Sequence, residues 1–334
     1  MDAEAPLGLA MTRRLIPLVL AAALACAATA SAEERFALIV TGAPGGESFA
    51  ATYAEWQQQL QAALIENLGF MPANVTVLSG TSADAAEQGA DTSTGQNVRA
   101  AITALRARLQ KDDLLLIVLV GHGTLDGGEA KFNLVGPDLT SVEWGELLHG
   151  LPGRVVAINT TGGSFPFMRD LAARGRIVLT ATQSVAQRYD TVFPEQFIAA
   201  LRDPAADLDK NGRVSMWELF QRTSHAVANH YERQGLLPTE RAMLDDTGDG
   251  EGIEAGGKGD DGALARATYL ERDPVAAESD PEMIDLLTRR RALEEQAERL
   301  KQRKPTMPLE QWEREFEELM IELARVSRRL RSRS

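Results

Sequence analysis

The chain has 334 residues, of which 44% are hydrophobic and 25% are charged, and its net charge is −13 at pH 7. This length suffices for one large hydrophobic core with appendages or for two modest domains. The acidic balance argues against nucleic acid as a partner, because a phosphate backbone is bound by clustered lysine and arginine side chains. An acidic surface favours solubility and the binding of cations.

The N-terminus has the pattern of a secretory signal peptide. Arg13 and Arg14 precede an apolar stretch at 15–28, and Ala-Ser-Ala at 30–32 provides a cleavage site of small residues. We expect residues 1–32 to be removed and the protein to be exported, to the periplasm or out of the cell, with no transmembrane span left. A membrane anchor is the alternative, but the stretch is shorter than the ~20 residues that a span needs.

Cys26 is the only cysteine, so a chain that begins at Glu33 contains none. A lipoprotein anchored through Cys26 is a weaker alternative, because the usual large residue three positions earlier is missing. Without cysteine, the mature chain has no disulfide, no cysteine-ligated zinc site and no thiol nucleophile.

Apolar runs alternate with helical patterns from residue 36 onwards. The runs predict strands at 36–41, 75–78, 114–120, 155–159 and 177–182, with helices at 49–68 and 97–109 among them. The run at 114–120, LLLIVLV, is apolar at every position, as expected of a strand covered on both faces. The alternation predicts an α/β domain over residues 33–202, with a mainly parallel sheet flanked by helices and chemistry at the carboxyl ends of its strands.

Two of the predicted strands end in polar or glycine-rich sequence. Gly-His-Gly at 121–123 follows one, and Thr-Thr-Gly-Gly-Ser at 160–164 follows the other. If the two strands are neighbours, His122 meets Thr161 and Ser164 at one edge of the sheet. A histidine between glycines allows close approach of a substrate and could act as a general base, although Gly-His-Gly is also a tolerable turn.

Six segments occur in an order that resembles an exported bacterial branch of the caspase/legumain clan of cysteine peptidases. They are KDDLLLIVLVGHGTLDG, AKFNLVGPDLT, SVEWGELLHGL, RIVLTATQS, LDKNGRVSMWELF and TERAMLDDTGDG, and the resemblance covers roughly residues 35–330. It implies a caspase-like fold in which His122 matches the catalytic histidine. Asn159 matches the acidic or polar residue that ends the second strand, and Thr161 matches the catalytic cysteine.

Threonine at the cysteine position predicts a pseudoenzyme. A thiolate is accessible near neutral pH, whereas a threonine hydroxyl must lose its proton to a base during attack. We expect a protein that binds a peptide or protein without cutting it. One alternative is a hydrolase in which Thr161 or Ser164 attacks with His122 as the base, and another is a structural envelope protein.

Residues 207–218 match the template of an EF-hand calcium loop. Asp207, Asp209 and Asn211 occupy positions one, three and five, and Gly212 occupies the position of the sharp turn. The carbonyl of Arg213, the side chain of Ser215 and the closing Glu218 complete the ligand set. We expect calcium to clamp the sheet domain to the helix that follows, within residues 203–236. A polar turn with Ser215 as a helix cap is the alternative.

A second acidic turn, DDTGDG at 245–250, begins like a calcium loop but lacks the apolar eighth residue and the acidic twelfth. It is either another cation site or solvated sequence. Residues 244–262 are rich in glycine and acids, so we expect a loop or disorder there, within a linker at 237–280.

The C-terminal residues 281–334 contain two long helical patterns, at 281–303 and 309–331, separated by Lys-Pro-Thr-Met-Pro. The second carries apolar residues at coiled-coil spacing, namely Trp312, Phe316, Leu319, Leu323, Val326 and Leu330. We expect a helical hairpin that packs on itself or on the sheet domain. Binding a partner or forming oligomers is the alternative role.

Overall fold

The structure is a computed structural model that describes residues 33–187, 189–272 and 280–333. The predicted signal peptide at 1–32, Cys26 and part of the predicted linker lie outside the described residues. Among the helices of the described part, none is both long and apolar enough to cross a membrane.

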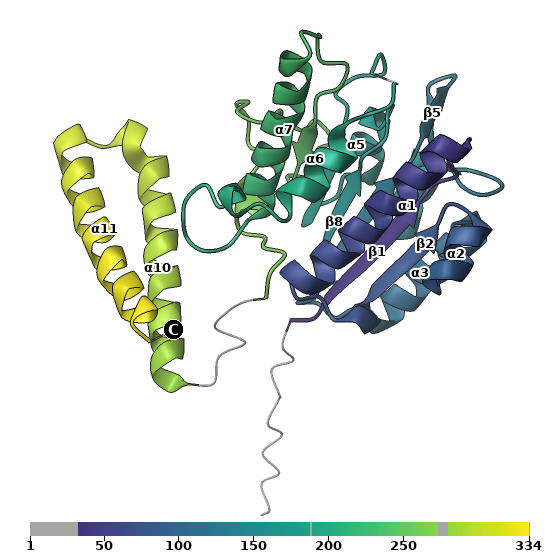
Figure 1. The fold of residues 1–334 in the computed structure, drawn as a ribbon. Coiled ribbons are helices and arrows are strands. Elements are labelled where there is room, and N and C mark those ends of the chain that lie inside the picture. Colours follow the sequence, from purple (N-terminus) through teal and green to yellow (C-terminus); the bar gives the residue numbers. More distant parts are fainter. Residues whose placement is uncertain (1–32, 188, 273–279, 334) are drawn as a thin grey trace, which may run out of the picture. The chain divides into compact units, whose positions relative to one another are not determined.

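A seven-stranded sheet organises the domain, in the order β10-β9-β8-β4-β1-β2-β3 (Figure 1). Its strands are β1 (Arg35–Thr41), β2 (Val75–Ser79), β3 (Asp91–Thr92), β4 (Leu114–Val120), β8 (Arg154–Asn159), β9 (Arg176–Thr180) and β10 (Met243–Asp245). Neighbouring strands are parallel except β10, which pairs antiparallel with β9. The predicted α/β class with a mainly parallel sheet is confirmed.

Two sets of helices cover the two faces of this sheet. One face carries α1 (Glu47–Ala62), α6 (Phe193–Ala200) and α7 (Met216–Arg233), and the other carries α3 (Gly95–Arg108), α4 (Ser141–Leu148) and α5 (Phe165–Leu171). Leu116 and Ile158 belong to the first core, whereas Leu115 and Ala157 belong to the second. Because successive side chains of a strand point to opposite faces, both sets of positions must be apolar, which explains the run LLLIVLV.

Shorter elements connect these layers. A small antiparallel sheet of β5 (Gly123–Asp126), β6 (Glu129–Phe132) and β7 (Leu139–Thr140) follows β4. The remaining short helices and turns are α2 (Ser82–Gln88), α8 (Ala263–Arg266), a π-helical turn at Ala63–Asn67, and 3₁₀ turns at Pro72–Asn74, Pro204–Ala206 and Lys304–Thr306.

The expectation of a loop or disorder over residues 244–262 is wrong at the start of this range. Leu244 and Asp245 lie in β10 and are fully buried, and Leu244 also pairs with Ile253. A strand of three residues is too short to show a periodic pattern, and the surrounding glycines and acids hide it.

The C-terminal residues form the predicted hairpin, α10 (Pro281–Arg303) and α11 (Leu309–Arg331), with the predicted bounds. Leu286 and Leu293 of α10 pack with Val326 and Leu330 of α11. Trp312 donates its indole N–H to the carbonyl of Leu300, which ties the start of α11 to the end of α10.

Candidate functional site

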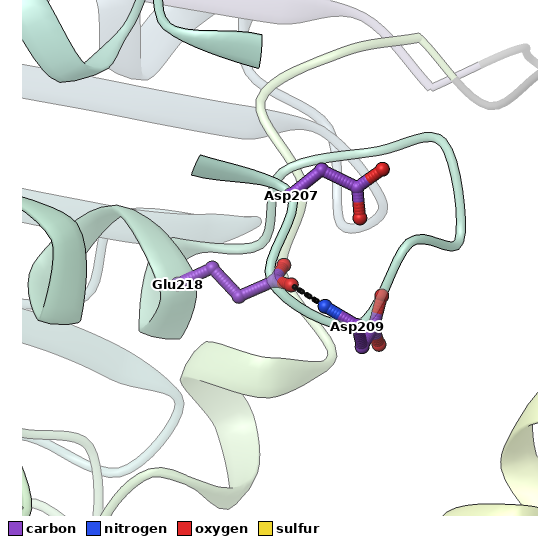
Figure 2. Close-up of side chains that lie close together, drawn as sticks. All are labelled: Asp207, Asp209 and Glu218. Carbon is purple, nitrogen blue, oxygen red and sulfur yellow. Dashed lines mark hydrogen bonds between the residues drawn. The ribbon is translucent and has the colours of Figure 1, made fainter. Parts of the chain in front are cut away.

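Three carboxylates of the predicted calcium loop converge. Asp207, Asp209 and Glu218 each offer an oxygen, and these oxygens lie within 4.8 Å of one another (Figure 2). The loop can turn back on itself because Gly212 has φ of 87°, a conformation that residues with a Cβ rarely adopt. Glu218 lies in the first turn of α7, so the helix holds this third carboxylate in place.

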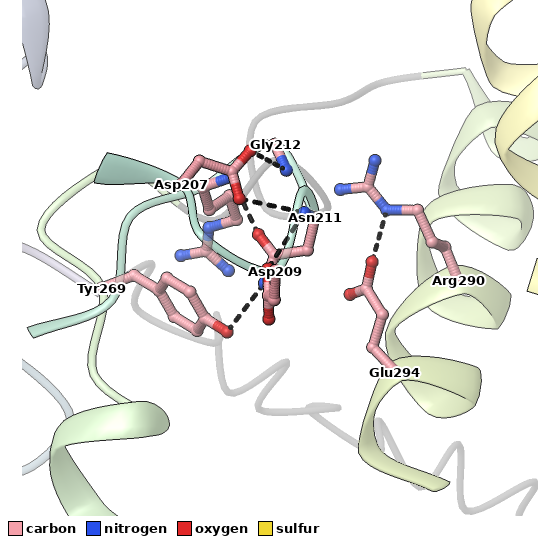
Figure 3. Close-up of polar contacts among 8 residues, drawn as sticks. Asp207, Asp209, Asn211, Gly212, Tyr269, Arg290 and Glu294 are labelled. Atoms are coloured by element: carbon pink, nitrogen blue, oxygen red, sulfur yellow. Dashed lines mark hydrogen bonds and ion pairs between the residues drawn. The ribbon is translucent and has the colours of Figure 1, made fainter. Parts of the chain in front are cut away.

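Backbone N–H groups of the loop point at these carboxylates. Asp207 accepts hydrogen bonds from the amides of Asn211 and Gly212, at 3.0 and 2.9 Å (Figure 3). Glu218 accepts from the amides of Leu208 and Asp209, at 3.0 and 3.2 Å. The loop is therefore held by its own acidic side chains.

The electrostatics of this cluster favour a cation. Burial raises the pKa of Asp209 to about 6, and the charges of Glu218 and Asp207 add to the rise. Burial also raises the pKa of Glu294 of α10, and the charge of Asp209 raises it further. Figure 3 shows Glu294 paired with Arg290, whose Nε lies 3.3 Å from the carboxylate. A bound divalent ion would relieve the repulsion among the loop carboxylates.

The other residues of the predicted ligand set make hydrogen bonds or ring contacts with their neighbours. The Asn211 side-chain oxygen accepts from the amide of Arg213, and the Asn211 side-chain amide donates to Asp209. Ser215 caps α7 in a capping box with Glu218, as the alternative reading of this segment expected. The guanidinium of Arg213 lies over the ring of Tyr269, 3.8 Å from its centroid.

Sequence reasoning missed the segment that supports the loop from outside. The amide of Val214 donates to the carboxylate of Glu271 at 3.1 Å, and Ser215 forms an antiparallel bridge with Tyr269. These partners lie more than 50 residues away in sequence. Nothing local in the sequence marks them as part of the loop.

A second group of carboxylates lies at β10. Asp245, Asp249 and Asp261 have oxygens within 4.8 Å of one another. Asp245 is fully buried and accepts the amides of Thr247, Gly248 and Gly250, all within 3.0 Å. Burial raises the pKa of Asp261, which sequence reasoning did not connect with the turn at 245–250. This group could also hold a metal ion.

The predicted catalytic positions lie at one edge of the sheet. β4 and β8 are parallel neighbours with Leu119 opposite Asn159, so the sequences that follow them emerge together. Thr161 is fully buried, and its hydroxyl donates to the side-chain oxygen of Asn159 at 2.8 Å. A Cβ on Gly123 would lie only 2.6 Å from that hydroxyl oxygen, so glycine is needed for this close approach.

Ser164 is equally enclosed. Its side chain is 1% exposed, its hydroxyl lies 3.0 Å from the hydroxyl of Thr182, and it accepts the amide of Thr182. These contacts close the turn that leads into α5. Neither hydroxyl at this edge faces solvent.

His122 is engaged on both sides of its ring. Nδ1 lies 3.1 Å from a carboxylate oxygen of Asp190, and Nε2 lies 3.1 Å from the carbonyl oxygen of Pro44. The rings of Phe49 and Tyr53 pack edge-on against it, with centroids 4.6 and 5.3 Å away. Both polar partners are acceptors, and a neutral imidazole, which has one N–H, can donate to only one of them. Within the described residues, no hydrogen bond joins His122 to Thr161 or Ser164.

Comparison with known proteins finds similarity only among solved structures. The chain is similar to the Drosophila initiator caspase Dronc, with 13% identity and a TM-score of 0.43, over 70% of this chain and 84% of that one. It is also similar to protein GSU0716 from Geobacter sulfurreducens, with 14% identity and a TM-score of 0.44, over 72% of this chain and 99% of that one. No protein-family model and no curated protein matches the sequence.

Proposed function

We propose that this chain is an exported calcium-binding protein on a caspase/legumain-like frame that has lost peptidase activity and acts by binding a peptide or protein. The observation that carries the proposal is the state of the residue at the catalytic cysteine position. Thr161 is fully buried and its hydroxyl is bonded to Asn159.

Hydrolysis by a hydroxyl group requires access to the substrate and a base that removes the proton during attack. A substrate cannot reach Thr161 or Ser164, because both residues are buried and both hydroxyls are hydrogen-bonded to neighbouring side chains. His122 is not placed to act as that base, because its two ring nitrogens face Asp190 and the carbonyl of Pro44 and, within the described residues, no hydrogen bond joins it to either hydroxyl. A peptide that reaches these strand ends would therefore be held without being cut.

Purified residues 33–334 should retain peptides from a library without cleaving them, with or without millimolar calcium. Thr161→Ala and His122→Ala should show the same background as the unaltered chain, because neither group is placed for catalysis. Mass spectrometry of the recovered library measures this. Cleavage that both substitutions abolish would instead establish a hydrolase with Thr161 as nucleophile and His122 as base.

The calcium part of the proposal rests on the loop at 207–218. Calcium takes six to eight oxygen ligands, and three carboxylates that already converge provide the charge for it. Glu218 belongs to α7, and Asp207 begins the loop directly after the 3₁₀ turn at Pro204–Ala206, so an ion held by both would clamp the helix to the sheet domain. A single loop facing an extracytoplasmic space should bind with a Kd of about 10⁻⁴–10⁻³ M.

Calcium affinity should fall about tenfold between pH 7.5 and pH 5, because protons compete for Asp209, whose pKa is raised to about 6. The raised pKa also means that the folded, calcium-free chain holds this proton more tightly than the unfolded chain. Its contribution to stability is therefore present below pH ~4 and is lost as the pH rises through ~6. Isothermal titration at both pH values measures the affinity.

The same titration distinguishes the two parts of this prediction. Absence of binding at pH 7.5 would contradict the calcium site itself. Binding with equal affinity at both pH values would leave the site intact and remove Asp209 from its ligands.

A further inference from the structure

Helix α11 carries opposite charges on its two halves. Residues 310–322 contain six glutamates and one arginine, a net charge of −5, whereas residues 323–331 contain four arginines and no acid, a net charge of +4. Met320 and Ile321 lie near the end of the acidic half and are 40% and 46% exposed. Large apolar side chains are therefore exposed close to the point where the charge changes sign.

One exposed stripe of α11 shows this order most clearly, and we call it the charge stripe. Its residues follow at intervals of three and four, so they share one face of the helix. They are Glu310, Glu313, Glu317, Met320, Ala324, Arg328 and Arg331, all exposed. The face that packs on α10 is a different one, made of Leu319, Leu323, Val326 and Leu330.

Other charged side chains of α11, and Arg333 just beyond its end, already form ion pairs inside the hairpin. Glu322 pairs with Arg289, Arg329 pairs with Glu282, and Arg333 pairs with Asp280 and Glu282. No charged residue of the charge stripe makes an ion pair with another described residue. The helix dipole favours acids in the first turn and bases in the last, but Glu313 and Glu317 lie beyond the first turn.

We propose that the charge stripe binds a second copy of this chain, with the two α11 helices antiparallel and a two-fold axis between Met320 and Ile321. In this arrangement, two residues of different copies face each other when their residue numbers add up to 641. Glu313 meets the second copy's Arg328, Glu310 meets its Arg331, and Met320 meets its Ile321. Each contact occurs twice, as symmetry requires.

Parallel pairing does not fit the same stripe. It would place each glutamate opposite the same glutamate of the second copy, and each arginine opposite the same arginine, which is repulsive. In the antiparallel pair, Glu317 faces Ala324, whose small side chain allows close approach beside the exposed Met320 and Ile321. The order of charges therefore selects both the partner and its direction.

Charge reversal tests this arrangement in residues 33–334 by sedimentation over a range of concentrations. Glu313→Arg and Arg328→Glu should each weaken the dimer at least about tenfold, because each creates two repulsive contacts. The double variant Glu313→Arg, Arg328→Glu should dimerise within about threefold of the unaltered chain. An equal mixture of the two single variants should also dimerise, since every contact between unlike chains is then attractive.

Glu318→Arg is the matched control, because Glu318 is exposed on the same helix but lies off the charge stripe. It should change the dimer constant by less than about threefold. Dimerisation of the unaltered chain should weaken when the salt is raised from about 50 to about 500 mM. A chain that stays monomeric, single variants that dimerise normally, or a double variant without recovery would each overturn the proposal.

Discussion

Replacing Asp209 with asparagine should stabilise the calcium-free chain and remove most of the stabilisation that calcium confers. At neutral pH the charge of Asp209 is opposed by burial and by Glu218 and Asp207, which together raise its pKa to about 6. Asparagine keeps an oxygen for the hydrogen bond from the amide of Asn211, which Asp209 accepts at 3.0 Å. It brings no charge, and it gives up only the exposed hydrogen bond from the Asn211 side-chain amide. The calcium-free loop is relieved of repulsion, whereas the ion loses a ligand charge.

Glu218→Gln is the informative companion, because it should move the calcium-free stability in the opposite direction. Glu218 is 6% exposed, and its two oxygens accept the amides of Leu208, Asp209 and Ser215 and the Ser215 hydroxyl. A glutamine would turn a donor toward one of these donors, at a cost of about 1–3 kcal/mol. Both variants should lose the stabilisation by calcium. Without calcium, Asp209→Asn should raise the stability of the chain and Glu218→Gln should lower it.

Thermal unfolding in a chelator and in excess calcium measures both effects. Asp112→Asn serves as the control, because Asp112 is exposed and lies outside both carboxylate groups. If Asp209→Asn retained the full calcium response, the loop at 207–218 would not be the site. If it lowered the calcium-free stability, the repulsion argument would be wrong.

The sheet was predictable because β4 is apolar at every position and β8 is apolar from Val155 to Ile158. Both strands are covered by helices on both faces, so burial demands apolar residues at successive positions of these runs. The hairpin was predictable for a similar reason, since α10 and α11 are long and are separated by two prolines. β10 was missed because three residues carry no period.

The candidate site was predictable only where its parts are close in sequence. The spacing of Asp207, Asp209 and Glu218 placed three carboxylates around one loop, and they do converge. The supports from Glu271 and Tyr269 were not predictable, because they arise from chain segments that meet only in the folded protein.

The strand ends follow the same rule. Parallel strands with adjacent register bring His122 and Thr161 to one edge of the sheet, as the pattern predicts. The partners that occupy His122, Asp190 and the carbonyl of Pro44, come from two connecting loops. Loop conformations depend on tertiary contacts, so sequence spacing does not reveal whether a histidine is free to act as a base.

Replacing Arg176 with leucine should destabilise the chain by about 3 kcal/mol, as expected for the loss of two charge-assisted hydrogen bonds. Arg176 begins β9 and is 7% exposed. Its Nη1 donates to the carbonyl of Leu171 and its Nη2 to the carbonyl of Leu148, each at 2.6 Å. These carbonyls end α5 and α4, where helices have unpaired acceptors and a partial negative charge.

Loss of this guanidinium should also loosen the strand-end site. α5 begins directly after Ser164, and Arg176 binds the carbonyl at the other end of this helix. Urea unfolding should show the loss for Arg176→Leu and a smaller loss for Arg176→Lys, since an ammonium lacks the rigid fork that spans two carbonyls. Arg174→Leu, two residues earlier and exposed, should change stability by less than about 0.5 kcal/mol. Equal losses for Arg174→Leu and Arg176→Leu would show that α4 and α5 do not depend on this guanidinium.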